Sequence, residues 1–218
     1  MKSTNTDKVA FDVASLLFEI GAILIRPDKP FKYTSGILSP IYTDNRLILS
    51  FPKVRNKIIK YMIEKVRQIS MPDLIAGTAT AGIPYAAIIA HQLNLPMVYV
   101  RPNPKNYGKK NQIEGKVKRG NSALVIEDLV TTAKSSFSVI TALRKSGAVV
   151  KNELVIFTYG LKSAENRFKL SQVNCYALSN LKTVTDFAIQ KGILEQDQSN
   201  RIFEWAKNPQ KWSQEHKG

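Results

Sequence analysis

The sequence predicts an α/β fold built on a doubly wound parallel sheet. Short apolar runs follow one another in the second half of the chain, without the polar alternation of a strand that has one solvent face. Helix-like segments separate most of these runs. Strands of this kind are buried on both sides, which is typical of a parallel sheet covered by helices. The runs occupy residues 73–77, 97–101, 123–128, 153–159 and 173–179.

The first 70 residues are predicted to form two helices with an irregular segment between them. Residues 7–25 carry apolar side chains at helical spacing, and Asp7 is a suitable N-cap. Residues 27–46 are interrupted by proline and glycine, which favours short strands and turns. Helical spacing returns over residues 53–69.

The strands are expected to alternate with helices, and the chain is expected to end in a helical tail. The predicted connecting helices cover residues 83–93, 135–146 and 163–170. The tail, residues 183–218, carries aromatic side chains that can anchor it to the core: Phe203, Trp205 and Trp212.

Composition narrows the class of protein. An apolar share of 44% is ample for a packed core, and no apolar run approaches the 18 or so residues that a membrane span needs. The N-terminus lacks the apolar run of a secretory signal, so we expect a cytoplasmic protein. The one cysteine, Cys175, cannot form an internal disulfide and is interpreted as a small buried hydrophobe.

The net charge of +15 indicates a protein that handles anions. The lysines are spread along most of the chain, so a generally solvated basic surface is the simpler interpretation. The charge does not identify the anion, and nucleic acid is not a predicted partner.

Two carboxylates and a hydroxyl-rich turn follow the third apolar run. Glu127 and Asp128 lie at the expected strand end, and residues 129–135 then lead into a helix. Adjacent carboxylates are costly to bury unless a metal ion or sugar hydroxyls compensate them. Backbone N–H groups at a helix start can bind a phosphate. A ribose 5-phosphate needs both features, although an ordinary capped turn with solvent-exposed acids would look the same.

Two further segments follow predicted strands. Residues 76–84 are mostly small, which allows a ligand to approach the backbone closely. An ordinary tight turn between a strand and a helix would have the same composition. Residues 101–119 are polar, rich in cations and without predicted structure, which favours a mobile lid over a substrate. A solvated basic loop is the alternative for this second segment.

The segment 125–135, VIEDLVTTAKS, resembles the signature of type I phosphoribosyltransferases, which bind 5-phosphoribosyl 1-diphosphate (PRPP). The resemblance implies that Glu127 and Asp128 hold the ribose hydroxyls. It also implies that the 5-phosphate is bound by the loop residues Leu129, Val130, Thr131, Thr132, Ala133, Lys134 and Ser135. The family usually has a glycine where this chain has Ala133 or Lys134, so Ala133 would be strained if the backbone there needs a positive φ.

Three other segments resemble orotate phosphoribosyltransferases. The run 76–84 is similar to their diphosphate loop, which implies PRPP contacts by Thr78 and Ala79. The lid pattern R-x-x-x-K-x-H-G is matched from Arg101 to Gly108 except that Tyr107 replaces histidine. This implies PRPP contacts by Arg101, Lys105 and Tyr107, with catalytic roles for Arg101, Lys105 and Asp128.

Residues 31–46, FKYTSGILSPIYTDNR, resemble the N-terminal hood of orotate phosphoribosyltransferases, which purine enzymes lack. The residues that this implies for orotate binding are Ser35, Gly36, Tyr42, Thr43 and Thr131. The similarity extends over roughly residues 10–180. It implies a type I phosphoribosyltransferase fold as a single domain over residues 1–218. A helix and hood would occupy about 1–50, a PRPP-binding core about 71–180, and a helical tail about 181–218.

The resemblance also implies an activity: orotate and PRPP give orotidine 5'-monophosphate and diphosphate, in pyrimidine biosynthesis. The expected cofactor is Mg²⁺, held mainly by PRPP rather than by a protein metal site. The expected assembly is a homodimer whose lid acts across subunits. Two alternatives stay open: a phosphoribosyltransferase for another base, and a regulator that binds PRPP without turnover and uses its basic surface on nucleic acid.

Overall fold

The centre of the molecule is a six-stranded sheet with the strand order β10-β9-β8-β5-β6-β7. The computed structural model describes residues 5–33, 35–102 and 111–216. Five strands are parallel, and β7 pairs antiparallel with β6 at one edge. The strands are β5 (Leu74–Thr78), β6 (Met97–Val100), β7 (Ile113–Glu114), β8 (Ser122–Val130), β9 (Val149–Thr158) and β10 (Asn174–Asn180). All five predicted strands are confirmed, whereas β7 lies in the segment 101–119 that was expected to lack structure.

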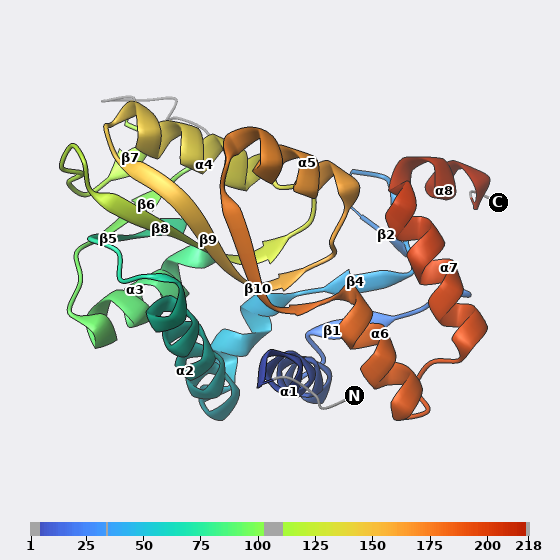
Figure 1. Ribbon diagram of the computed structural model, residues 1–218. Coiled ribbons are helices and arrows are strands. Elements are labelled where there is room, and N and C mark those ends of the chain that lie inside the picture. The colour runs from blue at the N-terminus through green and yellow to red at the C-terminus, as the bar shows by residue number, and fades with distance from the viewer. Residues whose placement is uncertain (1–4, 34, 103–110, 217–218) are drawn as a thin grey trace.

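Helices cover both faces of this sheet, as a doubly wound fold requires (Figure 1). On one face lie α1 (Asn5–Glu19), α2 (Pro52–Ile69) and α3 (Gly82–Leu93). On the other lie α4 (Lys134–Lys145) and α5 (Lys162–Ser171). The predicted α/β class is therefore confirmed, and the connecting helices begin and end within a residue of their predicted limits.

The alternation of side chains along β8 divides the core into two layers. Leu124 and Ile126 pack with the layer under α1, α2 and α3, whereas Val125 packs with the layer under α4. Both sets are buried. This explains why the strand shows a continuous apolar run instead of an alternating one.

The first predicted helix is too long. It ends at Glu19, because Gly21 adopts a φ of +68° and residues Ile23–Ile25 form strand β1, which pairs with β4 (Ile41–Thr43). Asp7 lies in the first turn of the helix rather than at its cap. Apolar residues continue past the true helix end, so their spacing alone did not reveal the change of structure.

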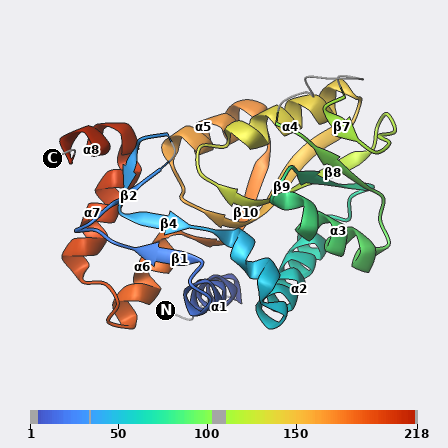
Figure 2. The same ribbon diagram turned by 180° about the vertical axis from the view of Figure 1, so that it is seen from behind.

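A smaller layer of strands and helices lies beside the main sheet (Figure 2). It contains β1, β4, the hairpin of β2 (Phe31–Lys32) and β3 (Leu38–Ser39), and the 3-10 helix η1 (Asn45–Ser50). The tail adds α6 (Leu181–Gln190), α7 (Gln196–Lys207) and α8 (Pro209–Glu215). We call the segment 23–50 the hood.

The helical tail holds the hood against the sheet. The indole N–H of Trp205 donates to the carbonyl of Leu38 at 3.1 Å, and the amide of Leu38 donates to Ser213 at 2.9 Å. Trp205 also meets the ring of Tyr159 edge-on, with centroids 5.6 Å apart. Trp205 and Trp212 are buried and Phe203 is half-buried, which confirms the predicted aromatic anchors.

Candidate active site

A cleft of about 360 Å³ opens where the chain reverses its direction through the sheet. From β5 the chain moves outward to β6 and then returns to β8 on the other side of β5. The segments after β5 and β8 therefore diverge and leave a crevice at the carboxyl ends of the strands, where ligands bind in such folds. The lining consists of Thr43, Asp44, Asn45, Arg46, Ala79, Thr80, Ala81, Glu127, Asp128, Leu129 and Ser135.

Glu127 and Asp128 bring two carboxyl groups into this cleft with little solvent around them. Their exposed fractions are 5% and 8%. Burial raises the pKa of Glu127 well above its usual value, and the neighbouring charges of Asp128 and Glu153 raise it further. Burial also raises the pKa of Asp128, although hydrogen bonds with Glu127 and with the backbone partly offset this. A ligand that donates hydrogen bonds, such as a sugar diol, would relieve this cost.

Asn45 braces the acid pair from the hood. Its side-chain NH₂ group donates to the backbone carbonyl of Asp128 at 2.7 Å, and the backbone carbonyl of Asn45 accepts from the Tyr85 hydroxyl at 2.8 Å. Asn45 is buried, and its Oδ1 has no partner within the described residues. Asn45 was not predicted as a site residue, because its contact joins residues 83 positions apart.

The start of η1 carries a second charged pair in the lining of the cleft. The Arg46 guanidinium donates to both carboxylate oxygens of Asp44, at 2.7 and 2.8 Å. These bonds lower the pKa of Asp44 and raise that of Arg46. Arg46 is exposed, so its charge remains accessible to an anion.

The loop between β8 and α4 has the backbone shape of an anion site. Ala133 adopts a left-handed conformation with φ +56° and ψ 25°, directly before the first helical residue, Lys134. The backbone N–H groups of Thr132, Ala133, Lys134 and Ser135 find no acceptor in the described part of the chain. Successive free N–H groups at the start of a helix form a concave site that attracts phosphate. The strain that the sequence predicted for Ala133 is therefore present.

Two side chains support this loop from beneath. Arg167 of α5 donates to the carbonyl of Thr132 at 2.6 Å. Ser136, in the first turn of α4, donates to the buried carboxyl group of Glu153 at 2.7 Å. Neither contact was anticipated, because α5 and β9 are distant in sequence and no motif links them to the loop.

The small residues after β5 serve packing as well as the cleft. A Cβ on Gly82 would overlap the carbonyl oxygen of Ile126, and one on Gly77 would lie 2.9 Å from the Cβ of Ala86. These glycines let α3 pack closely against β5 and β8. Of the two predicted contact residues, Ala79 lines the cleft. Thr78 is buried just behind it, with no partner for its hydroxyl within the described residues.

The predicted orotate contacts divide into two groups. Thr43 is buried, lines the cleft and accepts from the Tyr159 hydroxyl at 3.0 Å. Ser35 and Gly36 lie in the exposed turn between β2 and β3, and Tyr42 packs against Tyr33 with ring centroids 6.3 Å apart. These three residues and the half-buried Thr131 are outside the cleft lining.

Of the predicted lid, residues 101–119, the structure describes 101, 102 and 111–119. Arg101 leaves β6 with its guanidinium 5.6 Å from the centroid of Tyr99 and 3.7 Å from the carboxylate of Glu114. It is not among the residues that line the cleft. Lys105 and Tyr107 lie outside the described residues.

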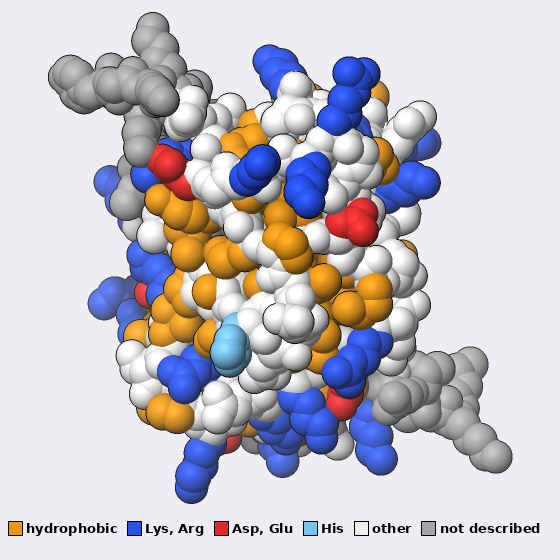
Figure 3. Space-filling model, turned by 90° about the vertical axis from the view of Figure 1, so that its left-hand side faces the viewer, with side chains coloured by type: hydrophobic (Ala, Val, Ile, Leu, Met, Phe, Trp, Pro, Cys, Tyr) orange, Lys and Arg blue, Asp and Glu red, His pale blue; other side chains and the backbone are white. Residues whose placement is uncertain are grey.

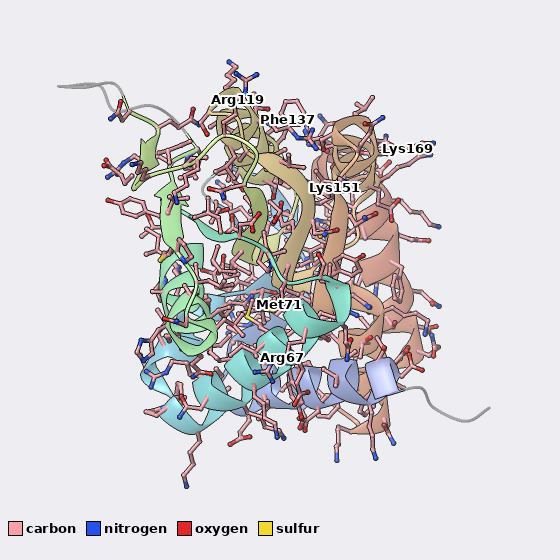
Figure 4. All side chains as sticks on the ribbon, turned by 60° about the vertical axis from the view of Figure 1, so that its left-hand side comes forward. Arg67, Met71, Arg119, Phe137, Lys151 and Lys169 are labelled. Carbon is pink, nitrogen blue, oxygen red and sulfur yellow. The ribbon has the colours of Figure 1, made fainter. Side chains whose placement is uncertain are left out.

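Many of the excess cations lie away from the cleft. Arg67, Lys151 and Lys169 are exposed around the amino ends of the strands, with the exposed Met71 among them (Figure 4). The cleft lies at the carboxyl ends of the strands, which is the opposite end of the sheet. These cations belong to the general surface and not to the cleft lining.

Known proteins resemble this chain over almost its whole length. A family model described as "Phosphoribosyl transferase domain" matches residues 47–172. The orotate phosphoribosyltransferase of Coxiella burnetii is 43% identical over 204 residues, which are 93% of this chain and 98% of the relative. That of Bacillus subtilis is 45% identical over 199 residues, 91% of this chain and 92% of the relative. This chain belongs to the orotate phosphoribosyltransferase family.

A solved member of the orotate phosphoribosyltransferase family has the same fold. The crystal structure of the orotate phosphoribosyltransferase from Aeropyrum pernix superposes with a TM-score of 0.72 at 29% identity. The likeness covers 84% of this chain and 99% of that one. The predicted type I phosphoribosyltransferase fold is thereby confirmed.

The left-handed conformation of Ala133 yields a stability prediction. Ala133→Gly and Ala142→Gly both carry the entropic cost of glycine, about 1 kcal/mol, but only Ala133→Gly also removes a backbone strain of about 1–2 kcal/mol. Both alanines are buried in the same layer, at 3% and 7% exposure, so the lost methyl contacts are comparable. In urea unfolding, the Ala133→Gly variant should be more stable than Ala142→Gly by about 1–2 kcal/mol. If both variants lose the same free energy of unfolding relative to the wild type, the backbone at Ala133 is not strained.

Proposed function

We propose that the cleft between β5 and β8 is the active site at which PRPP and orotate give orotidine 5'-monophosphate and diphosphate. The observation that carries this proposal is the pairing of two buried carboxyl groups with a loop of free N–H groups at the strand ends. A diol site beside a phosphate site matches the two ends of a ribose 5-phosphate. The relatives named orotate phosphoribosyltransferase support the choice of base.

Each part of PRPP has a counterpart in the cleft. Glu127 and Asp128 accept from the ribose hydroxyls, which compensates their burial. The segment 129–135, which runs from the last two residues of β8 into the first turn of α4, binds the 5-phosphate, and the dipole of α4 adds to the attraction. Ala79 and Thr80 line the opposite wall, where the backbone after β5 meets the diphosphate.

The residues act mainly by orientation and charge. Displacement at the anomeric carbon passes through an oxocarbenium-like state, which the buried carboxylates stabilise electrostatically when ionised. Orotate is an anion at neutral pH, so no general base is required. Arg101 and Lys105 are proposed to approach the leaving diphosphate from the lid, and closing the lid excludes water.

The proposed cofactor, Mg²⁺, fits the chemistry of the cleft. Mg²⁺ prefers oxygen ligands. Asp44, Asp128 and Asn45 line the cleft, and the Oδ1 of Asn45 has no partner within the described residues. Within the described residues, no group of three or more His, Cys, Asp or Glu side chains gathers as a metal site. We propose that the diphosphate and ribose oxygens of PRPP supply most ligands, and the ion would offset the charge of the leaving group.

Orotate is proposed to bind between the hood and the loop, beside Thr43. Tyr159 links this region to the sheet, because its hydroxyl donates to Thr43 and lies 3.4 Å from the Tyr33 hydroxyl. Ser35, Gly36 and Tyr42 would border the base only if the hood turn moves toward the cleft on binding. Thr131 would contact it from the loop.

A homodimer with lids shared between subunits is also proposed. Apolar side chains gather on one face, over α3 and β6, which lie on the left of Figure 1 (Figure 3). The half-buried apolar residues of these elements include Ile83, Ile88, Leu93, Met97 and Tyr99. A second copy of the chain would cover this face.

No described helix is long and apolar enough to cross a membrane. We propose the cytoplasm as the site of action.

The direct test of the activity is to follow the ultraviolet absorbance of orotate in the presence of PRPP and Mg²⁺. Asp128→Ala should lower kcat/KM by roughly 10²–10⁴-fold, because each lost charge-assisted hydrogen bond contributes about 1.5–3 kcal/mol. Its melting temperature should not fall at neutral pH, since burial raises the pKa of Asp128 and its charge does not stabilise the fold.

Asp73→Ala is the matched control. Asp73 is exposed at the amino edge of the sheet and accepts from Ser122, far from the cleft. Its kcat/KM should stay within about twofold of the wild type. Near-normal kinetics in the Asp128 variant would refute the diol role, whereas turnover of a purine base in place of orotate would change the substrate.

The proposed dimer can be tested at Ala87, which is exposed on α3. Ala87→Arg adds a long charged side chain to the apolar face, so light scattering should detect a monomer with an unchanged helical circular dichroism spectrum. Gln68→Arg on α2, which is also exposed, should leave the assembly unchanged. An Ala87→Arg variant that still forms dimers would place the interface elsewhere.

A further inference from the structure

Glu153 is a fully buried acid that the proposed chemistry does not use. It lies in the middle of β9, between Val125 of β8 and Cys175 of β10, with an exposed fraction of 0%. Its Oε1 accepts from the Ser136 hydroxyl at 2.7 Å. Its Oε2 is buried without a partner within the described residues.

Ser136 connects this acid to the phosphate loop. It follows Ser135, which lines the cleft, and it lies in the turn of α4 that begins at the strained Ala133. Ser136 is itself fully buried, so the hydrogen bond is shielded from water. The contact therefore joins the centre of the sheet to the part of the helix whose N–H groups face the proposed phosphate.

We propose that Glu153, as a neutral acid, is a positioning residue for the 5-phosphate loop and acts through Ser136. This inference rests on the proposed assignment of residues 129–135 as the PRPP loop. The neutral form holds the first turn of α4 in register with the sheet. The ionised form would place an unpaired negative charge beneath the site of a phosphate dianion.

The groups around Glu153 leave its charge uncompensated. Glu127 on β8 is a second buried carboxyl group whose pKa is raised by burial and by its acidic neighbours. Cys175 on β10 is a thiol whose own pKa is raised by burial and by Glu153. On the helices above, Arg167 donates to the carbonyls of Thr132 and Ser163. Arg144 donates to those of Ser171 and Val150, so neither arginine is bonded to Glu153. Burial raises the pKa of Glu153 to about 8.

The test compares wild type with Glu153→Gln between pH 7 and pH 9.5, a range in which the phosphates of PRPP are already ionised. Gln keeps the acceptor for Ser136 and cannot ionise. At pH 7 the two proteins should have similar KM values for PRPP. Above pH 8 the wild-type KM for PRPP should rise several-fold relative to that of the Gln variant, while the KM for orotate changes equally in both.

Two further variants separate positioning from simple packing. Glu153→Ala and Ser136→Ala should each raise the KM for PRPP by roughly three- to tenfold at all pH values, the range expected for one buried hydrogen bond. The double variant should be no worse than the more affected single variant, because both remove the same contact. If Glu153→Ala fails to fold, the comparison of wild type with Glu153→Gln still tests the role of Glu153.

Thermal unfolding gives an independent readout of the protonation state. A raised pKa means that the folded protein holds the proton that the unfolded chain releases near the usual value of 4.5. Wild type should therefore lose melting temperature relative to Glu153→Gln as the pH rises from about 4.5 to about 8, with no further change above that. Asp73→Asn serves as the control for an exposed acid whose pKa is lowered.

The outcomes separate the two proposals. Matching pH profiles of the KM for PRPP in wild type and Glu153→Gln would overturn the role of Glu153, provided that Asp128→Ala has lost its activity. If Asp128→Ala is instead active, the site assignment itself fails. Two results together support the role of Glu153 and the site assignment. The KM for PRPP rises at high pH in wild type but not in Glu153→Gln, and Asp128→Ala is impaired.

Discussion

The site depends on one constraint: two neighbouring carboxyl groups must be buried near the carboxyl end of the central strand β8, which continues to Val130. Glu127 and Asp128 are only 5% and 8% exposed, and burial raises the pKa of both. Asn45 fixes the backbone of Asp128 from the hood, and the glycines after β5 let α3 approach β8. The surrounding elements thus hold the two carboxyl groups in a buried position, and hydrogen bonds from a ligand would offset the cost of burying them.

The phosphate loop illustrates how strain and support are combined. Ala133 adopts a conformation that glycine would adopt more easily, and the family pattern has glycine near this position. Contacts from distant elements hold the loop in place: Arg167 bonds to the carbonyl of Thr132, and Glu153 bonds to Ser136. An unfavourable local conformation is therefore maintained by tertiary contacts, which leave the N–H groups free for an anion.

The hood and the tail act together although they are far apart in the sequence. Trp205 and Ser213 of the tail bond to Leu38 of the hood, and Tyr159 at the end of β9 bonds to Thr43. The hood is therefore tied to the same sheet end that carries the acid pair. This coupling gives the helical tail a part in shaping the site, even though it contributes no residue to the cleft lining.

The sequence by itself determined the alternating strands and helices, the acid pair and the loop that follows it. These features depend on residues adjacent in the chain, and apolar runs and turn residues report them directly. Only the tertiary structure decided the end of the first helix at Glu19, the strand β7 and the contacts of Asn45, Arg167 and Glu153. It also separated Thr43, in the cleft, from Ser35 and Gly36 in the outer turn. The physical reason is that such contacts join residues tens of positions apart, and local patterns carry no information on which distant backbone group a side chain will meet.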